Sequence, residues 1–204
     1  MKDTRERLLE AALDLFAEHG FEDVTVRDLS AKAGVNLQAI GYHFGDKLGL
    51  YRTLVEMAMD GARSVQEKLR EESHGLTPDE QLRHYVCVYL PLIAASESPR
   101  IQKLQRVMRH EFNTPSPLAK HFIERIIVPR LLYLSEIIAG ILECPADDPR
   151  VRTCTLSVQA QCMYYAREPV RKMLPPAWRV EAKELPSIAE HVATISLAGI
   201  KALK

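Results

Sequence analysis

Apolar residues recur along this chain at spacings of three and four, and this helical period constrains its fold more than any other feature. The first stripe consists of Leu8, Ala12, Leu15 and Phe16, and it ends at Gly20. The sequence contains no runs of alternating apolar and polar residues bounded by hairpin turns, which would indicate strands. The pattern therefore predicts an all-α fold of about nine helices.

The residues that interrupt the helices divide the chain in two. All twelve prolines lie at position 78 or later, whereas five of the nine glycines lie between Gly20 and Gly49. Glycine permits tight turns between short helices, whereas proline sets the ends and bends of longer ones. We therefore expect a three-helix N-terminal domain over residues 1–47 and a larger helical domain over residues 48–204.

Capping signals predict where the helices begin. Two pairs have the three-residue spacing of a capping box: Asp3 with Glu6, and Thr25 with Asp28. Asn36 is expected to cap a helix over residues 37–44, and Asp46 a helix that starts at Lys47. Further helices are predicted over residues 78–95, 99–113, 117–143 (with a bend at Pro129), 149–167 and 186–203.

The most informative segment runs from Thr25 to Lys47. It has two short helices on either side of a turn that contains Gly34, which is the arrangement of a helix-turn-helix. The first residues of the second helix face outward, where they can reach base edges in the major groove of DNA. The segment therefore predicts a protein that binds double-stranded DNA.

TetR-family transcriptional regulators have a DNA-binding domain that this chain resembles in two sequences, AALDLFAEHGFEDVTVRDLSAKAGV and YHFGDKLGLY. The residues from Ile40 to Gly45, with the Gly-Leu-Tyr that ends at Tyr51, are also similar to a subgroup associated with drug-sensitivity and efflux genes. The resemblance covers roughly the first 50 residues, and the remainder is similar only in length and helical character. It implies a ligand-responsive repressor that leaves a palindromic operator when a small apolar or amphipathic molecule binds.

The resemblance also implies which residues contact DNA. They are Thr25, Arg27, Asn36, Leu37, Gln38, Ala39, Tyr42, His43 and Lys47. Residues 37–39 lie where the family approaches base edges, and Gln38 has a side-chain amide suited to bidentate bonding with adenine. Gly41 stands where many members have an aromatic residue, so the resemblance does not imply a particular operator sequence.

The other DNA contacts implied by the resemblance are to the phosphate backbone. Tyr42 and His43 lie where the family contacts that backbone, and Thr25 and Lys47 would each bring a helix N-terminus to a phosphate. Residues 1–50 contain six Lys or Arg against nine acidic residues, and the whole chain contains 27 of each sign. We therefore expect DNA affinity to fall with salt, but less steeply than for a protein with a basic arm.

A single helix-turn-helix reads only a few base pairs, so specific binding requires two copies. The family resemblance implies a homodimer through the last two helices. Their apolar stripes are Val151, Cys154, Val158, Cys162 and Tyr165 in one helix, and Ile188, Val192, Ile195 and Gly199 in the other. The alternative is that both stripes pack on the core of a single subunit.

The resemblance further implies a small-molecule effector of unknown identity. Aromatic, methionine and amide side chains suited to such a pocket are Tyr89, Met108, Phe112, Phe122, Tyr133, Gln161 and Tyr164. Plain core packing is the alternative for each of these residues.

Other functional classes have little support in the sequence. It contains no phosphate-binding glycine loop, nucleophile elbow or HExxH, so we expect neither an enzyme nor a cofactor, and no four-ligand metal set emerges. The four cysteines lack a CxxC pair, no apolar run is long enough to span a bilayer, and no secretory core follows the N-terminus, so we expect a cytoplasmic protein. A metal- or thiol-sensing regulator, an architectural DNA-binding protein without an inducer, and a helical interaction domain remain as alternatives.

Overall fold

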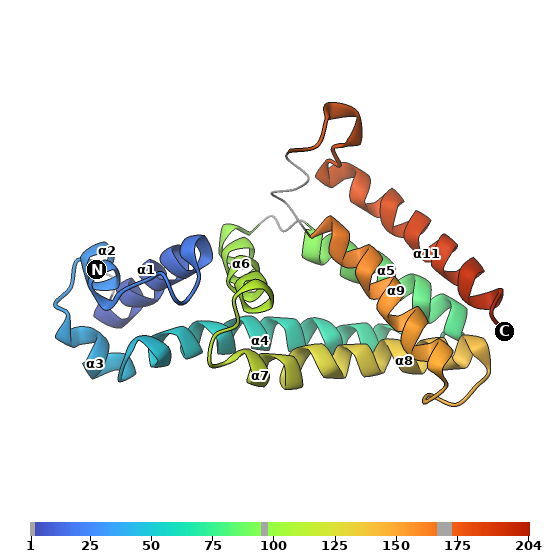
Figure 1. Cartoon of the computed structure of the whole chain (residues 1–204), viewed down its shortest axis with the longest axis horizontal. Coiled ribbons are helices and arrows are strands. Elements are labelled where there is room, and N and C mark those ends of the chain that lie inside the picture. Colours follow the sequence, from blue (N-terminus) through green and yellow to red (C-terminus); the bar gives the residue numbers. More distant parts are fainter. Residues whose placement is uncertain (1–2, 95–97, 167–172) are drawn as a thin grey trace. The chain divides into compact units, whose positions relative to one another are not determined.

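The computed structural model describes residues 3–94, 98–166 and 173–204, and these residues form helices joined by loops (Figure 1). No β-strand occurs in these three ranges, so the predicted all-α fold is confirmed. The helices form two compact units. The first consists of Met1–Ser64 and Glu97–Ile126, and the second of Val65–Ser96 and Ile127–Lys204.

The first unit is built around its N-terminal helix. Its elements are α1 (Thr4–His19), α2 (Val26–Ala33), α3 (Gln38–Phe44), the start of α4 (Lys47–Glu72), α6 (Pro99–Asn113), α7 (Ala119–Phe122) and the π-helical turn η1 (Ile123–Ile127). Helix α1 packs against α2, α3 and α6. Leu8, Phe16, Leu29, Ile40 and Tyr51 are fully buried and form the centre of this packing.

The second unit has longer helices and a larger apolar core. Its elements are the end of α4, α5 (Pro78–Ala94), α8 (Val128–Leu142), α9 (Pro149–Tyr165), two short 3-10 turns (Pro176–Trp178 and Ala182–Glu184) and α11 (Leu185–Lys201). Helix α5 packs against α8, α9 and α11. Leu82, Val86, Leu134, Ile138 and Cys162 are fully buried among these helices.

Most of the predicted helix boundaries are confirmed to within two residues. The largest difference lies in residues 117–143, where the helical segment starts at Ala119 and passes through the π-turn before α8 begins. Pro129 lies in the first turn of α8, where a backbone N–H would have no partner within the helix, so the missing N–H of proline costs nothing. The π-turn before it is wider than an α-helical turn and leaves room for the proline ring. A π-helical turn therefore directly precedes the helix turn that contains Pro129, and the predicted bend at Pro129 stays a prediction.

Of the two predicted capping boxes, one forms and the other does not. The Thr25 hydroxyl accepts from the backbone N–H of Asp28, and the Asp28 carboxylate accepts from the N–H of Thr25. Asp3 precedes α1 but makes no side-chain capping bond, so the predicted box with Glu6 is wrong. Both Asp3 and Glu6 are exposed, and water solvates their carboxylates as well as a helix N–H would.

The compact units do not follow the expected division at residue 47. Helices α6 and α7 belong by packing to the first unit, although they lie far beyond that boundary in the sequence. Packing groups helices by the surface that they share, and this need not coincide with the functional division. The division of the chain into residues 1–47 and 48–204 therefore stays a prediction about function.

Candidate nucleic-acid interface

The turn between α2 and α3 is held by a cation from α1. Gly34 has φ +62°, a left-handed conformation that favours glycine, and its N–H closes the end of α2. The Arg7 guanidinium donates to the carbonyl oxygens of Ala33 and Gly34, at 2.6 and 2.7 Å. These carbonyls have no partner within the helix, and a positive charge at a helix C-terminus is favourable. Arg7 therefore fixes the angle at which α3 leaves α2.

Helix α3 presents one buried and one open face. The Asn36 carboxamide oxygen accepts from the N–H of Gln38 at 3.0 Å, so Asn36 caps this helix as predicted. Ile40 points into the core of the first unit, whereas Leu37 is 47% exposed and Tyr42 is 86% exposed. Because the apolar parts of Leu37 and Tyr42 contribute little to the core, stability does not account for their presence. The exposed face of α3 is therefore available for a ligand.

The structure locates the other residues predicted to contact DNA around this face. Thr25, Arg27 and Gln38 are exposed, and Ala39 and His43 are half-buried. The ring of His43 lies edge-on to that of Tyr42, with the ring centroids 4.9 Å apart. Thr25 is already engaged in its capping box, and its hydrogen bonds hold the pKa of the Asp28 carboxyl below its usual value.

Lys47 has a structural role that the sequence did not indicate. Its ammonium group donates to the carbonyl oxygens of Phe21 and Val24, both at 2.9 Å, and lies 4.2 Å from the centroid of the Phe21 ring. The side chain thus ties the first turn of α4 to the loop between α1 and α2. An ammonium has three donors, so one N–H remains beyond these two bonds. No spacing rule in the sequence links residue 47 to residues 21 and 24, and the same holds for Arg7.

The start of α4 is fixed by two further contacts. The Asp46 carboxylate accepts from the N–H of Gly49 at 2.7 Å, which confirms the predicted cap. Gly49 has no space for a side chain, since a Cβ at this position would lie 1.9 Å from the carbonyl oxygen of Phe44. The α3–α4 connection is therefore closely packed, and the N-terminus of α4 stays next to the end of α3.

A buried hydrogen-bond network joins α4 to α6 within the first unit. The Tyr51 hydroxyl donates to the Glu111 carboxylate, which also accepts from the hydroxyl and the N–H of Ser116, at 3.0 and 3.3 Å. Burial and the neighbouring carboxylate raise the pKa of Tyr51, so its hydroxyl keeps its proton. The ring of Tyr51 packs on Phe16 and Phe21, with centroid distances of 4.9 Å to each. Helix α6 is thereby hydrogen-bonded to α4, whose Tyr51 also packs on Phe16 of α1.

The residues predicted to contact an effector are divided between the two units. Met108 and Phe122 lie in the first unit; Tyr89, Tyr133, Gln161 and Tyr164 lie in the second. The side chain of Phe112 lies outside the part of the chain that the structure describes. The predicted set is therefore divided between the two units, and its assignment to an effector stays a prediction.

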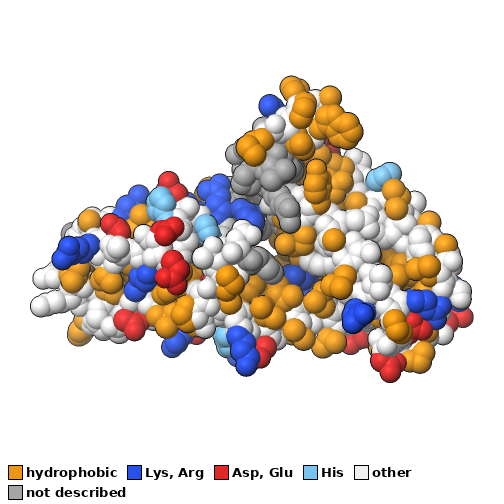
Figure 2. Space-filling view, in the orientation of Figure 1, with side chains coloured by type: hydrophobic (Ala, Val, Ile, Leu, Met, Phe, Trp, Pro, Cys, Tyr) orange, Lys and Arg blue, Asp and Glu red, His pale blue; other side chains and the backbone are white. Residues whose placement is uncertain are grey.

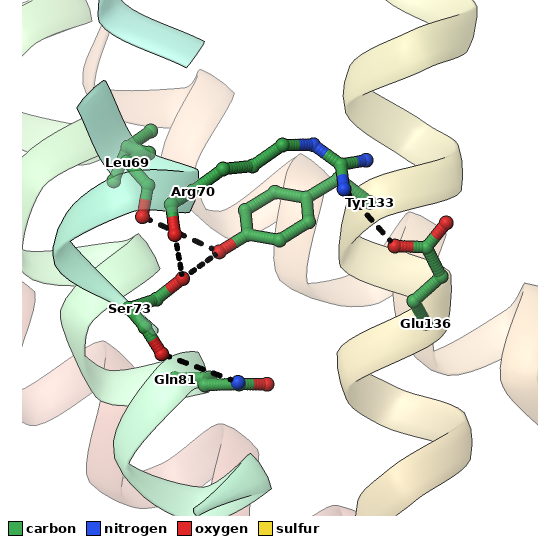
Figure 3. A network of polar contacts seen from close by, with 6 residues as sticks. All are labelled: Leu69, Arg70, Ser73, Gln81, Tyr133 and Glu136. Atoms are coloured by element: carbon green, nitrogen blue, oxygen red, sulfur yellow. Dashed lines mark hydrogen bonds and ion pairs between the residues drawn. The ribbon is translucent and has the colours of Figure 1, made fainter. Parts of the chain in front are cut away.

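Two of the predicted effector contacts have their polar groups engaged by neighbouring helices. The Tyr133 hydroxyl is 2.6 Å from the Ser73 hydroxyl and donates to the Leu69 carbonyl, and Gln81 donates to the Ser73 carbonyl from α5 (Figure 3). Gln161 donates to the Ser196 hydroxyl at 3.2 Å and so joins α9 to α11. These contacts indicate helix–helix packing for both side chains.

Two family models match the chain. One is described as "HTH-type transcriptional dual regulator CecR, C-terminal domain" and matches residues 78–200, more than half of the chain. The other is described as "Bacterial regulatory proteins, tetR family" and matches residues 8–54, which include α2 and α3. The chain belongs to the TetR family.

Individual TetR-family proteins agree with this assignment. A probable acrEF/envCD operon repressor of Escherichia coli (strain K12) is 35% identical over 114 residues, which are 54% of this chain and 50% of that relative, so the match spans half of the relative's length. The HTH-type transcriptional dual regulator CecR of Shigella flexneri is 24% identical over 200 residues, which cover 95% of this chain and 89% of the relative. The solved structure of the TetR-family regulator PfmR from Thermus thermophilus has the same fold, with a TM-score of 0.68 at 20% identity over 97% of both chains.

The apolar stripes predicted to form the dimer interface of this TetR-family protein are largely internal. Val151, Cys154, Val158, Cys162 and Val192 are buried in the core of the second unit, so assigning them to a dimer interface was wrong. The α9 stripe is the core-facing side of an amphipathic helix, whereas in the α11 stripe Val192 is buried but Ile195 and Gly199 are exposed. The sequence period alone does not distinguish a side that faces the core from one that faces a partner.

The opposite sides of α9 and α11 are exposed. Leu156 and Tyr164 of α9 and Ile195 of α11 are each about half exposed, so Tyr164 does not line the interior of a single subunit. Figure 2 also shows hydrophobic side chains gathered over the segment that precedes α11, where Met173 and Trp178 are exposed.

Thiol and metal chemistry gain no support from the described part of this TetR-family chain. Burial raises the pKa of Cys162 to about 12 and that of Cys87 to about 11, which keeps both thiols protonated and weakly reactive. Within the ranges that the structure describes, no three His, Cys, Asp or Glu side chains are grouped so that they can hold a metal ion. No helix among these residues combines the length and apolarity needed to cross a membrane.

Proposed function

We propose that this TetR-family protein is a ligand-responsive, sequence-specific DNA-binding regulator that represses transcription from a palindromic operator. The observation that carries the proposal is the open face of α3, where Leu37, Gln38 and Tyr42 project from a helix that Ile40, Arg7 and Asn36 hold rigidly. A rigid helix with an exposed polar and aromatic face is what major-groove reading requires.

In this proposal the nine predicted residues act in two groups. Leu37, Gln38 and Ala39 contact base edges. Thr25, Arg27, Tyr42, His43 and Lys47 contact the phosphate backbone, and Asn36 positions α3 through its cap. Two of the three Lys47 donors serve the Phe21 and Val24 carbonyls, so Lys47 contributes mainly by holding the N-terminus of α4 in place, with one N–H left for a phosphate.

DNA-binding measurements with matched variants test this proposal. Fluorescence anisotropy on DNA from immediately upstream of the protein's own coding region, at two salt concentrations, should show binding about a thousandfold tighter than on unrelated DNA. Tyr42→Ala should weaken binding to all sequences by about tenfold, and Gln38→Ala should also relax discrimination at one base pair. Lys120→Ala is the charge control, because Lys120 is an exposed cation on α7 with no predicted contact to DNA. Folded Tyr42 and Gln38 variants that bind like the wild type would contradict the site assignment.

A homodimer is part of the proposal, because two copies of α3 are needed to read a palindrome. The exposed sides of α9 and α11 support this, with Leu156, Tyr164 and Ile195 available for a self-complementary contact. Sedimentation of the wild type should give a dimer at micromolar concentration, and Leu156→Glu with Ile195→Glu should give a folded monomer. A monomeric wild type that does not dimerise on DNA would contradict it.

The effector is proposed to be a small apolar or amphipathic molecule that binds among the helices of the 48–204 domain and favours a conformation with lower DNA affinity. Since its partner is chromosomal DNA, the proposed location is the cytoplasm. Specific DNA binding that no small molecule changes would favour an architectural protein without an inducer. An absence of salt-dependent DNA binding would favour a helical interaction domain.

A further inference from the structure

The core of the second unit contains a set of polar groups where α5, α8 and α9 pack together. The Tyr85 hydroxyl donates to the Gln159 carboxamide oxygen at 3.2 Å, and the Gln159 amide donates to the Tyr89 hydroxyl at 3.0 Å. The Tyr89 hydroxyl in turn lies 3.8 Å from the sulfur of Met163. The two tyrosine rings are stacked with a centroid distance of 5.4 Å. Every side chain of this set has a polar partner.

Arg130 of α8 lies beside this set and has no such partner. Its guanidinium carbon is 4.7 Å from the centroid of the Tyr89 ring. Its Nε is buried without a hydrogen bond, and within the ranges that the structure describes Arg130 makes neither a hydrogen bond nor an ion pair. A half-buried guanidinium without an anion is less favourable than a paired one, because its buried Nε has neither water nor a carboxylate as a partner. The ring of Tyr89 compensates it only in part.

The surrounding helices have no carboxylate available to Arg130. Helix α9 contains no acidic residue, and α8 contains only Glu136, which pairs with Arg70. The two acidic residues of α5 lie in its first turn. Asp79 pairs with Lys201, and the Glu80 carboxylate accepts a hydrogen bond from the N–H of Thr77. Arg130 therefore has no carboxylate partner among these three helices.

We propose that Arg130 binds the carboxylate of a monoanionic amphipathic effector, whose apolar body lies along the half-buried edge formed by Arg130, Gln159 and Met163. This inference rests on the proposed function, because it gives the chemical class of the effector. A guanidinium binds a carboxylate through two parallel hydrogen bonds, and one unpaired positive charge matches one negative charge. Arg130, Gln159 and Met163 are each half-buried, so this edge of the core is open to solvent and accessible to a ligand.

Arg70 provides a matched control within the same unit. Its guanidinium carbon lies 4.3 Å from the centroid of the Tyr133 ring, so it makes the same kind of cation–π contact as Arg130 (Figure 3). It differs in having a carboxylate, since its Nη1 is 3.4 Å from the Glu136 carboxylate oxygen. Removing Arg70 therefore removes a similar aromatic contact without removing an unpaired cation.

The experiment measures binding of paired probes to the full chain by calorimetry. The probes are butyrate, decanoate, benzoate and phenylacetate, each compared with its uncharged methyl ester. We expect at least one carboxylate to bind the wild type about tenfold more tightly than its ester. Arg130→Gln should abolish this preference and change the affinity for the ester by less than about twofold, whereas Arg70→Gln should retain the preference. Arg130→Lys should retain part of it, because an ammonium keeps the charge but loses the planar fork.

Two results would overturn the inference. One is a wild type that binds no carboxylate better than its ester. The other is a folded Arg130→Gln variant that retains the preference; if that variant also melts at a lower temperature than the wild type, the Tyr89 contact of Arg130 is structural. DNA binding is measured on the same samples by anisotropy. Specific DNA binding without a carboxylate preference contradicts only this inference, whereas loss of all specific DNA binding contradicts the proposed function.

Discussion

The two compact units hold their helices together by different means. In the first unit, helices pack on the apolar side of α1, and two long cationic side chains add hydrogen bonds from α1 and α4 to backbone carbonyls on either side of α2. Arg7 bonds the carbonyls at the end of α2, and Lys47 bonds those of Phe21 and Val24 before α2. These bonds set the angles between α1, α2 and α4, on which the direction of α3 depends.

In the second unit, helices of seventeen and fifteen residues bury continuous apolar faces against one another. Its core is a single cluster that includes Leu134, Ile138 and Val158, and its hydrogen bonds between side chains add to an apolar contact that already exists. The difference indicates that directional bonds to backbone carbonyls add to apolar packing in orienting the helices of the first unit, whereas the second unit depends on summed apolar area. Variants of each kind test this distinction.

The largest effect is expected from a cavity in the second unit. Leu134 is fully buried, and Leu134→Ala should lower the free energy of unfolding by about 3 kcal/mol, because it removes apolar contacts and leaves a void. Leu132 lies in the same helix and is 57% exposed, so Leu132→Ala should change this free energy by less than about 0.5 kcal/mol. Urea denaturation followed by circular dichroism measures both, and equal effects would contradict the description of this core.

A smaller effect is expected when a directional bond of the first unit is removed. Lys47→Met keeps the apolar stem but leaves two carbonyls without a donor, which should cost about 2 kcal/mol. Lys32→Met is the control, because the Lys32 ammonium is exposed and 3.9 Å from Asp14, and a change below about 0.5 kcal/mol is expected. DNA affinity should fall with Lys47→Met even at temperatures where the protein is folded. An unchanged affinity would show that the hydrogen bonds of Lys47 to Phe21 and Val24 are not needed to position the N-terminus of α4.

Two glycines of the helix-turn-helix should respond in opposite directions. Gly34→Ala should destabilise the protein by about 1.5 kcal/mol, because φ is +62° and the new Cβ would lie 2.8 Å from the Arg7 guanidinium. Gly41→Ala should stabilise it by about 0.7 kcal/mol, because Gly41 is helical and a Cβ there has no atom within 4 Å. Thermal unfolding of both variants tests the contrast. A destabilising Gly41→Ala would mean that α3 is not the regular helix described.

The smallest effect is a pH dependence at the start of α2. Hydrogen bonds from Thr25 lower the pKa of Asp28 below its ordinary value of 3.8, so the folded state favours the ionised carboxylate. This contribution is present above about pH 4 and is lost as the pH falls through the lowered pKa. The stability difference between the wild type and Asp28→Asn should therefore stay constant above about pH 5 and shrink as the pH falls from about 4 to about 3. A difference that stays constant over this range would contradict the capping bond.

Local signals in the sequence predicted local structure well. The Thr25–Asp28 box, the Asn36 and Asp46 caps and the turn at Gly34 each depend on residues within a few positions of one another, and all of them form. The predicted capping box of Asp3 and Glu6 was wrong. The three-residue spacing lets a side chain reach a helix N–H, but it does not make that hydrogen bond more favourable than hydration of the carboxylate. The roles of Arg7, Lys47 and Arg130 could not be predicted, since each depends on residues more than twenty positions away or on the absence of a partner.

The sequence by itself determined the all-α class, most helix boundaries, the helix-turn-helix and the family, because these follow from period, capping chemistry and motif order along the chain. Only the tertiary structure decided which side of α9 and α11 is the core, how α6 is bonded to α4 through Tyr51 and Glu111, and that Arg130 has no anion among the helices that surround it. The apolar side of an amphipathic helix can pack either on its own subunit or on a partner subunit, and the sequence pattern is the same in both cases. A side chain's hydrogen-bond partners depend on which helices meet, and that is a property of the folded chain alone.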